Sequence, residues 1–240
     1  MSHTLSDIVR SSDRITPTAD LHVEVIADFV CPFCFLGKRH MDEALKAVQG
    51  PSDVSWNPFQ LNPEIPPEGL PFDVYLTKRF GSPANVEPVL EHLTDEGKDA
   101  GIQFRFDKIR HVPNTLPVHQ LMQYAETAGA DQTALADHLM SAFFEDGSNV
   151  GDRGILVDIA KAHGISSKET GDAIGSDRIR QIVATREAQV RSSGLAGAPG
   201  FLINRRLLVV GAQSADNMIN AFDRAMFGEG TDSLVSPALH

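Results

Sequence analysis

Two cysteines three residues apart are the strongest chemical signal in this sequence. They are the only cysteines among 240 residues, and they lie in the run Cys31-Pro32-Phe33-Cys34. Two thiols at this spacing can form and break a disulfide, which is the chemistry of a dithiol oxidoreductase. A zinc site would need about four ligands, and no His-x₃₋₅-His pair lies downstream at finger spacing. An inert cysteine pair is the other alternative.

The residues around the cysteines predict a strand followed by a helix. Residues 21–29 are apolar at every second position, as in a strand. Pro32 suits the first turn of a helix, and the apolar residues that follow recur at helical spacing: Met41, Ala44, Leu45 and Val48. Free amide groups and the helix dipole at this N-terminus favour a thiolate at Cys31. We therefore expect Cys31 to be the exposed nucleophile and Cys34, one turn later, to be the shielded thiol.

A second segment, far along the chain, could complete the site. Gly197-Ala198-Pro199-Gly200 precedes two short apolar strands, 201–204 and 207–210, and a helix that Ser214 would cap. Taken alone, Pro199 could be an ordinary proline at the start of a strand. After the upstream strand–helix–strand pattern, however, this strand–hairpin–helix order is the expected complement.

With both segments in view, the chain resembles the DsbA-like thioredoxin-fold oxidoreductases, and within them the FrnE-like branch. The resemblance is carried by residues 28–38, 57–64, 66–69, 113–116 with His119, 144–147, 197–199 and 210–213. It implies a nucleophilic Cys31, a resolving Cys34 and a cis peptide bond between Ala198 and Pro199. On this basis the candidate substrate-binding residues at the site are Pro32, Phe33, Ala198 and Pro199.

Two positions depart from the family pattern. The family often has a bulky or β-branched residue before the cis-proline, where this chain has Ala198, and usually a larger residue after it, where this chain has Gly200. We expect both changes to open the groove that receives the substrate.

The segment between the two halves has the periodicity of several amphipathic helices. We therefore predict an α/β protein, a thioredoxin fold with a large inserted α-helical domain. The predicted boundaries are a disordered tail at 1–20, the thioredoxin domain at 21–62 plus 192–228, the helical domain at 63–191 and a C-terminal tail at 229–240. Pro58 lies inside the strand predicted at 54–61, and since proline removes a ladder donor, that strand should lie at a sheet edge.

Asn114 and His119 are weaker candidates for substrate binding beside Cys31. Asn114 or its neighbour Thr115 could instead cap the helix that follows, and His119 could be a surface or hydrogen-bonded histidine. Lys38 lies just inside the predicted helix of Cys31, where it could support the thiolate, although a solvated side chain is the simpler interpretation.

The composition restricts the partners. The chain has 21 Lys and Arg against 32 Asp and Glu, a net charge of −11, which disfavours nucleic acids and anionic membranes. Residues 1–20 lack the apolar core of a secretory signal, so we expect a cytoplasmic protein. We expect no metal and no tightly bound cofactor, with glutathione as a candidate co-substrate. The oligomeric state stays open.

The leading functional hypothesis is a thiol–disulfide oxidoreductase that reduces or isomerises disulfides of a protein or a small thiol. The first alternative is a glutathione-dependent isomerase or transferase, as in the related 2-hydroxychromene-2-carboxylate isomerases and kappa-class glutathione transferases. Those relatives typically have a serine where this chain has Cys31. The second alternative is a non-catalytic thioredoxin-fold module that binds peptides or acts as a chaperone.

Overall fold

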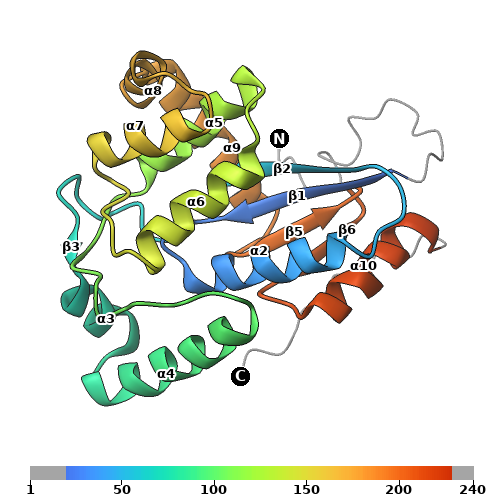
Figure 1. Cartoon of the computed structure of the whole chain (residues 1–240), viewed down its shortest axis with the longest axis horizontal. Coiled ribbons are helices and arrows are strands. Elements are labelled where there is room, and N and C mark those ends of the chain that lie inside the picture. The colour runs from blue at the N-terminus through green and yellow to red at the C-terminus, as the bar shows by residue number, and fades with distance from the viewer. Residues whose placement is uncertain (1–19, 229–240) are drawn as a thin grey trace.

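The computed structural model describes residues 20–228 and has a four-stranded mixed sheet at its centre (Figure 1). The strand order is β2-β1-β5-β6. The strands are β1 (Leu21–Ala27), β2 (Ser52–Pro58), β5 (Gly200–Ile203) and β6 (Leu207–Val210). β1 runs parallel to β2 and antiparallel to β5, which pairs antiparallel with β6. Both ends of the chain thus contribute to one sheet. The predicted tails lie outside the described residues, apart from Asp20.

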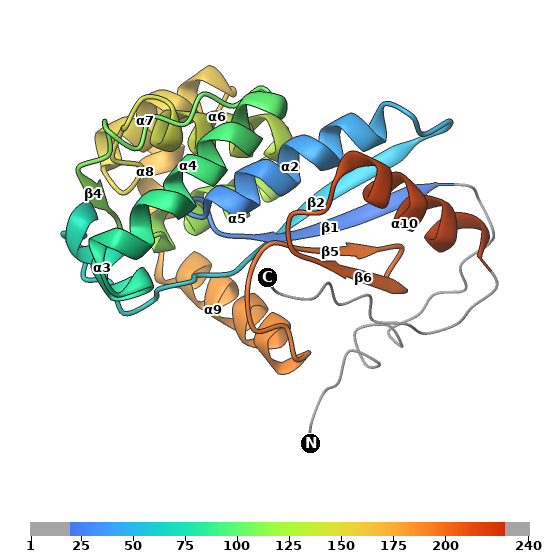
Figure 2. The same ribbon diagram turned by 90° about the horizontal axis from the view of Figure 1, so that it is seen from below.

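The two faces of the sheet are covered separately, because strand residues point alternately to opposite sides. Phe201 and Ile203 belong to the main core, which includes residues of α2 (Pro32–Leu45) and α10 (Ala215–Phe227). On the opposite face, α9 (Asp177–Ser192) covers a smaller cluster (Figure 2): Ile26, Phe59, Val190, Leu195, Leu202 and Leu208. The side chain of Ser214 caps α10, as predicted, by accepting the amide N–H of Asn217.

The segment between β2 and β5 is mainly helical. It comprises α3 (Phe72–Phe80), α4 (Pro83–Asp99), α5 (Leu116–Ala128), α6 (Gln132–Phe144), α7 (Arg153–Ala162), α8 (Ser167–Ile174) and α9, with a short ribbon of β3 (Leu70–Pro71) and β4 (His111–Val112). The architecture is therefore the predicted α/β thioredoxin fold with a helical insertion. Within the described residues, none of the helices is both long and apolar enough to cross a membrane.

The predicted edge position of the proline-containing strand is confirmed, because β2 forms one end of the sheet. The strand stops at Pro58, opposite Ala27, and not at residue 61. The next amides are taken by side chains: Gln60 donates to Glu187 at 2.9 Å and Leu61 donates to Asp28 at 2.7 Å. The chain thus leaves the sheet beside the cysteines.

An ion cluster around the buried Lys38 joins α2 to α6. Lys38 Nζ lies 2.6 Å from Asp42 and 2.5 Å from Asp137, and the Lys38 side chain is only 5% exposed. The expectation of a solvated Lys38 is therefore wrong, because the inserted helix α6 brings Asp137 over it. Burial raises the pKa of Asp42 above its ordinary value, although Lys38 acts in the opposite direction.

Removing the lysine should destabilise the protein markedly. We expect Lys38→Ala to lower the free energy of unfolding by about 3 kcal/mol at pH 7, because it removes the buried cation that pairs with Asp42 and leaves Asp137 with Arg39 alone. Since the pKa of Asp42 is already raised, acid protonates it early, so the deficit should be full at pH 7 and shrink as the pH falls towards about 4. Urea denaturation at several pH values measures this. Lys46→Ala, which breaks an exposed pair with Glu43, is the control and should change little; equal effects of the two variants would contradict the assignment.

Candidate active site

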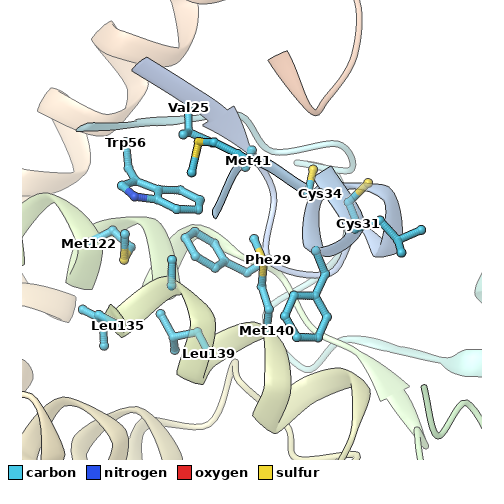
Figure 3. Packing of buried hydrophobic residues seen from close by; sticks show 14 of the residues in the cluster. Val25, Phe29, Cys31, Cys34, Met41, Trp56, Met122, Leu135, Leu139 and Met140 are labelled. Atoms are coloured by element: carbon cyan, nitrogen blue, oxygen red, sulfur yellow. The ribbon is translucent and has the colours of Figure 1, made fainter. Parts of the chain in front are cut away.

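The two cysteines occupy the first turn of α2. Cys31 is the N-cap residue, with an extended backbone, and Pro32 follows in the first turn. The amide of Cys34 donates to the carbonyl oxygen of Cys31 at 3.0 Å, so the two residues lie one turn apart, as predicted. Both are free thiols, and they lie at the margin of the main core (Figure 3).

The environment of Cys34 holds its thiol in the protonated form. The residue is 1% exposed, and its sulfur accepts the amide N–H of Asp28 at 3.5 Å. Burial raises the pKa of Cys34 well above its usual value, and the hydrogen bond and charge of Cys31 raise it further. At neutral pH, Cys34 therefore stays a protonated thiol.

The loop that contains Ala198 and Pro199, called the proline loop below, lies against the cysteines although it comes from the other half of the chain. The Ala198–Pro199 peptide bond is cis, as expected. The carbonyl oxygen of Ala198 lies 3.9 Å from the sulfur of Cys31, which confirms that this backbone faces Cys31. The amide of Gly211, at the end of β6, holds the loop by donating to the carbonyl of Pro199 at 2.9 Å.

Two expectations about access to the site are wrong. Cys31 is only 4% exposed, because its position at the helix start places it directly against the Ala198 loop. Gly200 does not open the groove, since a Cβ there would lie 2.9 Å from Leu195, whose side chain fills the space. Phe33, by contrast, is 39% exposed. The accessible apolar surface of the motif is therefore this phenylalanine.

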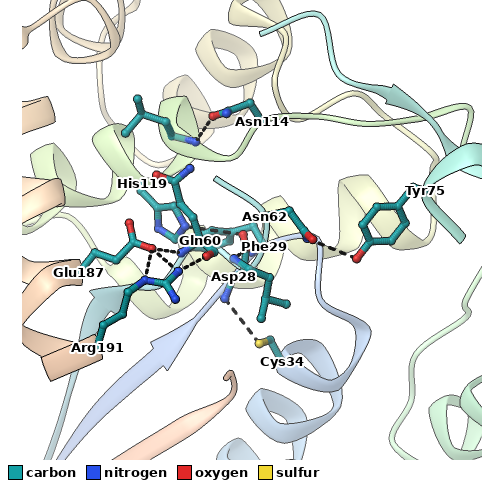
Figure 4. A network of polar contacts seen from close by, with 12 residues as sticks. Asp28, Phe29, Cys34, Gln60, Asn62, Tyr75, Asn114, His119, Glu187 and Arg191 are labelled. Carbon is teal, nitrogen blue, oxygen red and sulfur yellow. Dashed lines mark hydrogen bonds and ion pairs between the residues drawn. The ribbon is translucent and has the colours of Figure 1, made fainter. Parts of the chain in front are cut away.

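Asp28 is a residue of the site whose role sequence reasoning missed. Its carboxylate is 1% exposed and lies at the end of β1 (Figure 4). One oxygen accepts the amide of Phe29 at 2.8 Å, and the other accepts the amide of Leu61 at 2.7 Å. Asp28 thus fixes the chain on both sides of the site. An acidic residue that ends an apolar strand directly before the cysteines was the available signal.

Helix α9 also fixes the segment that follows β2, through the side chains of Glu187 and Arg191. Glu187 accepts the amide of Gln60, and Arg191 donates to the carbonyl of Gln60. The guanidinium of Arg191 also stacks on the ring of Phe59, 4.2 Å from its centroid. The segment after β2 is thus fixed between α9 and Asp28.

Asn114 is placed beside this loop and not at the sulfur atoms. Its amide donates to the carbonyl of Ile65 at 2.7 Å, while its side-chain oxygen accepts the amide of Leu116 at 3.0 Å. Asn114 therefore both anchors the loop and satisfies a free amide in the first turn of α5.

Tyr75 enters the site from α3. Its hydroxyl accepts a hydrogen bond from Asn62 at 3.5 Å. Burial raises the pKa of Tyr75, and negative charge at Cys31 and Asp28 raises it further, so the phenol stays neutral near the dithiol. Nothing in the sequence distinguishes Tyr75 from the other residues of an amphipathic helix.

His119 lies deeper than a substrate contact requires. It is 3% exposed, and its ring meets the ring of Phe29 edge-on, with centroids 5.3 Å apart. Its Nε2 atom lies 3.6 Å from an oxygen of Asp28. The structure thus places His119 in the interior, between Asp28 and the ring of Phe29.

Gly37 permits the proline loop to lie directly on α2. A Cβ at this position would lie 3.0 Å from the ring of Phe201 and 3.2 Å from the ring of Pro199. Glycine inside a helix costs about 1 kcal/mol relative to alanine, so its presence here is explained by the close approach.

We expect Gly37→Val to lower the free energy of unfolding by about 1–3 kcal/mol, because the added atoms push against Phe201 and Pro199. Disulfide reduction should also become slower, because the added side chain would push Pro199 and its loop away from Cys31. Denaturation curves and an insulin-reduction assay measure the two effects. Gly197→Val is the matched control, since a Cβ at Gly197 meets nothing within 4 Å. Wild-type stability of Gly37→Val would contradict this account of the glycine.

Comparison with known proteins identifies the family. Residues 22–223 match the DSBA-like thioredoxin domain. The chain is 25% identical over 211 residues to the uncharacterized protein YwbO of Bacillus subtilis (strain 168), covering 87% of this chain and 97% of YwbO. The probable DsbA oxidoreductase SCO1869 from Streptomyces coelicolor superposes with a TM-score of 0.80 at 26% identity, over 90% of this chain and 94% of that one. The cytosolic disulfide reductase DsbM from Pseudomonas aeruginosa, solved with GSH, shares the fold with a TM-score of 0.58 at 19% identity, over 85% of this chain and 95% of DsbM. The chain therefore belongs to the family of proteins with a DSBA-like thioredoxin domain.

Proposed function

We propose that this protein is a thiol–disulfide oxidoreductase that reduces or isomerises disulfides through the dithiol of Cys31 and Cys34. The observation that carries the proposal is the arrangement of the two thiols. They lie one helical turn apart at the start of α2, and the carbonyl of Ala198 lies 3.9 Å from the sulfur of Cys31. Burial and the neighbouring Cys31 both raise the pKa of Cys34, so this thiol stays protonated at neutral pH.

The reaction proceeds in two exchange steps. The thiolate of Cys31 attacks one sulfur of the substrate disulfide, whose S–S bond breaks as one substrate thiolate leaves, and a mixed disulfide forms. Cys34 then loses its proton and attacks the sulfur of Cys31. The second substrate thiolate leaves and the Cys31–Cys34 disulfide closes, so two electrons have passed to the substrate. In isomerisation, a substrate thiol attacks the mixed disulfide before Cys34 does.

The substrate binds along the edge formed by the motif and the proline loop. Phe33 supplies exposed apolar surface, and Pro32 turns the chain at the start of the helix. The backbone of Ala198 and Pro199 lies beside the sulfur, where an extended peptide can pair with main-chain groups. A disulfide-containing protein and a small disulfide such as that of glutathione are both candidate substrates; DsbM, with the same fold, is a disulfide reductase solved with GSH.

We place this activity in the cytoplasm, where the low reduction potential of the glutathione pool keeps an oxidising dithiol mostly reduced. Reduction and isomerisation are then the easier directions. The cytosolic description of DsbM supports the same setting.

The test is disulfide reduction with dithiothreitol as the electron source. The protein should accelerate precipitation of the insulin B chain or reduction of hydroxyethyl disulfide, well above the rate with dithiothreitol alone. The ratio of the two rates distinguishes protein from small-molecule substrates. No acceleration with either substrate would leave a non-catalytic binding module as the better account. Catalysed addition of reduced glutathione to an electrophilic small molecule by a Cys34→Ser variant would instead indicate transferase chemistry.

A further inference from the structure

A groove of about 810 Å³ lies between α3 and α4, two helices of the insertion that pack against each other (Figures 1 and 2). Three half-buried apolar side chains contribute to its lining: Leu76 of α3, and Val86 and Leu90 of α4. The volume is in the range of ligand sites, but the groove is open to solvent along its length. Its shape therefore suits a segment of another chain better than an enclosed small molecule.

Four carboxylates border this apolar lining. They are Asp73 on α3 and Glu87, Glu91 and Asp95 on α4, and all four are exposed. Lys98, the one base among the described residues of the lining, lies 2.7 Å from Asp95. Asp73, Glu87 and Glu91 form no ion pair with another residue between 20 and 228. Three uncompensated negative charges thus surround the apolar surface.

The side-chain donors of the groove are already engaged. The hydroxyl of Thr77 donates to the carbonyl oxygen of Asp73 at 2.8 Å, and that of Thr94 donates to the carbonyl oxygen of Leu90 at 2.7 Å. The ammonium group of Lys98 is held in its ion pair. A ligand must therefore bring hydrogen-bond donors and positive charge of its own, together with apolar surface.

The lining of α4 repeats at every fourth residue, so it forms two stripes that run side by side along the helix. Each stripe has three members: Val86, Leu90 and Thr94 in one, and Glu87, Glu91 and Asp95 in the other. Each stripe extends over two turns, about 12 Å. Like charges four residues apart weaken a helix, and cations on a ligand would relieve that repulsion. A second amphipathic helix can match both stripes, with apolar side chains on one and Lys or Arg on the other.

Helix α3 connects the groove to the dithiol site. Its residues Asp73, Leu76 and Thr77 line the groove, whereas Tyr75 of the same helix reaches the site, where its hydroxyl accepts a hydrogen bond from Asn62 (Figure 4). A segment bound in the groove therefore lies against the helix that borders the dithiol.

We propose that the groove between α3 and α4 binds a basic amphipathic helix of the protein substrate while the disulfide of that substrate reacts at Cys31. Two linked contacts raise the overall affinity, because the second forms within the complex that the first has made. The net charge of −11 attracts such a cationic partner. It disfavours a second copy of the chain, whose charge has the same sign. This inference rests on the proposed function and names a substrate class for it.

Binding to the groove is measured by fluorescence anisotropy with a labelled helical peptide that has no cysteine, leucines along one face and lysines beside them. Glu87→Gln/Glu91→Gln should weaken binding about fivefold, as should about 300 mM salt in place of about 50 mM. Leu90→Asn should have a similar effect, because it removes apolar contact. The control Asp158→Asn/Asp223→Asn changes two exposed acids on α7 and α10 and should bind as the wild type does. Equal weakening by both double variants would show non-specific attraction and overturn the inference.

Reduction kinetics test whether the groove serves the substrate. The same peptide is joined through a flexible linker to a short segment closed by one disulfide, and a second substrate has glutamates in place of the lysines. The wild type should show a KM about tenfold lower for the basic substrate, with a similar kcat. Glu87→Gln/Glu91→Gln should lose this difference in KM, and Asp158→Asn/Asp223→Asn should keep it. Equal KM values in the wild type would overturn the inference, even where the free peptide binds.

Two other occupants of the groove would also contradict the inference. A dimer that the peptide dissociates, seen by sedimentation velocity, would assign the groove to a second copy. A marked gain in peptide affinity after deletion of residues 1–19 would assign it to the chain's own N-terminal segment. Hydroxyethyl disulfide separates this inference from the proposed function. Its normal reduction without a KM difference between the two peptide substrates refutes the inference alone, whereas no reduction of any substrate refutes the function as well.

Discussion

Cys31→Ser should reduce no disulfide above the background of the reductant, whereas Cys34→Ser should complete the first exchange step and stop there. In the proposed mechanism, the first variant lacks the nucleophile at the helix N-terminus. The second keeps it but has no thiol to resolve the mixed disulfide, so the intermediate accumulates. With oxidised glutathione as the substrate, intact-mass spectrometry should show one glutathione bound to most of the Cys34→Ser protein.

The double variant Cys31→Ser/Cys34→Ser serves as the control and should carry no adduct. Release of the adduct by dithiothreitol shows that the bond is a disulfide. If Cys31→Ser retained insulin reduction, or if the adduct formed on Cys34, the assignment of the two roles would be wrong.

Alkylation should also distinguish the thiols, by at least tenfold in rate at pH 7. The thiolate is the reactive form, and burial raises the pKa of Cys34 well above its usual value, so its thiol stays protonated through the neutral range. Iodoacetamide should therefore label Cys31 first in the reduced protein, although both residues are almost fully buried. Peptide mass spectrometry over a time course measures both rates.

Labelling of the unfolded protein in urea provides the reference, since there the two cysteines should react alike. Cys34→Ser should label at Cys31 with the rate seen in the wild type. Preferential labelling of Cys34 in the folded protein would contradict the account of its burial.

The sheet and the dithiol could be predicted because their signals are local. Alternating apolar residues in 21–29, Pro32 in the first helical turn and the short strands after Pro199 each report a backbone conformation. The order of these elements then predicted one sheet built from both halves of the chain, and the pairing of β1 with β5 confirms it. The position of Pro58 in an edge strand could be predicted because proline has no backbone N–H to donate to a neighbouring strand.

The contacts across the site could not be predicted, because they join segments that lie far apart in the sequence. The amphipathic pattern of α5 and α6 shows that each has a buried face but not what it meets, so neither His119 beside Asp28 nor Asp137 above Lys38 could be foreseen. Gly200 was misjudged for the same reason, since Leu195 fills the space that the missing side chain leaves. The low exposure of Cys31 likewise depends on the distant Ala198 loop.

The most direct test of the central claim is the redox equilibrium of Cys31 and Cys34 in glutathione buffers of graded potential. Rapid acid quenching, alkylation of free thiols and intact-mass spectrometry give the fraction of each form. The account predicts one two-electron transition between the dithiol and a Cys31–Cys34 disulfide, with little glutathione adduct in the wild type. A protein that forms no Cys31–Cys34 disulfide at any potential, or that stays as a stable glutathione adduct while Cys34 remains free, would contradict it.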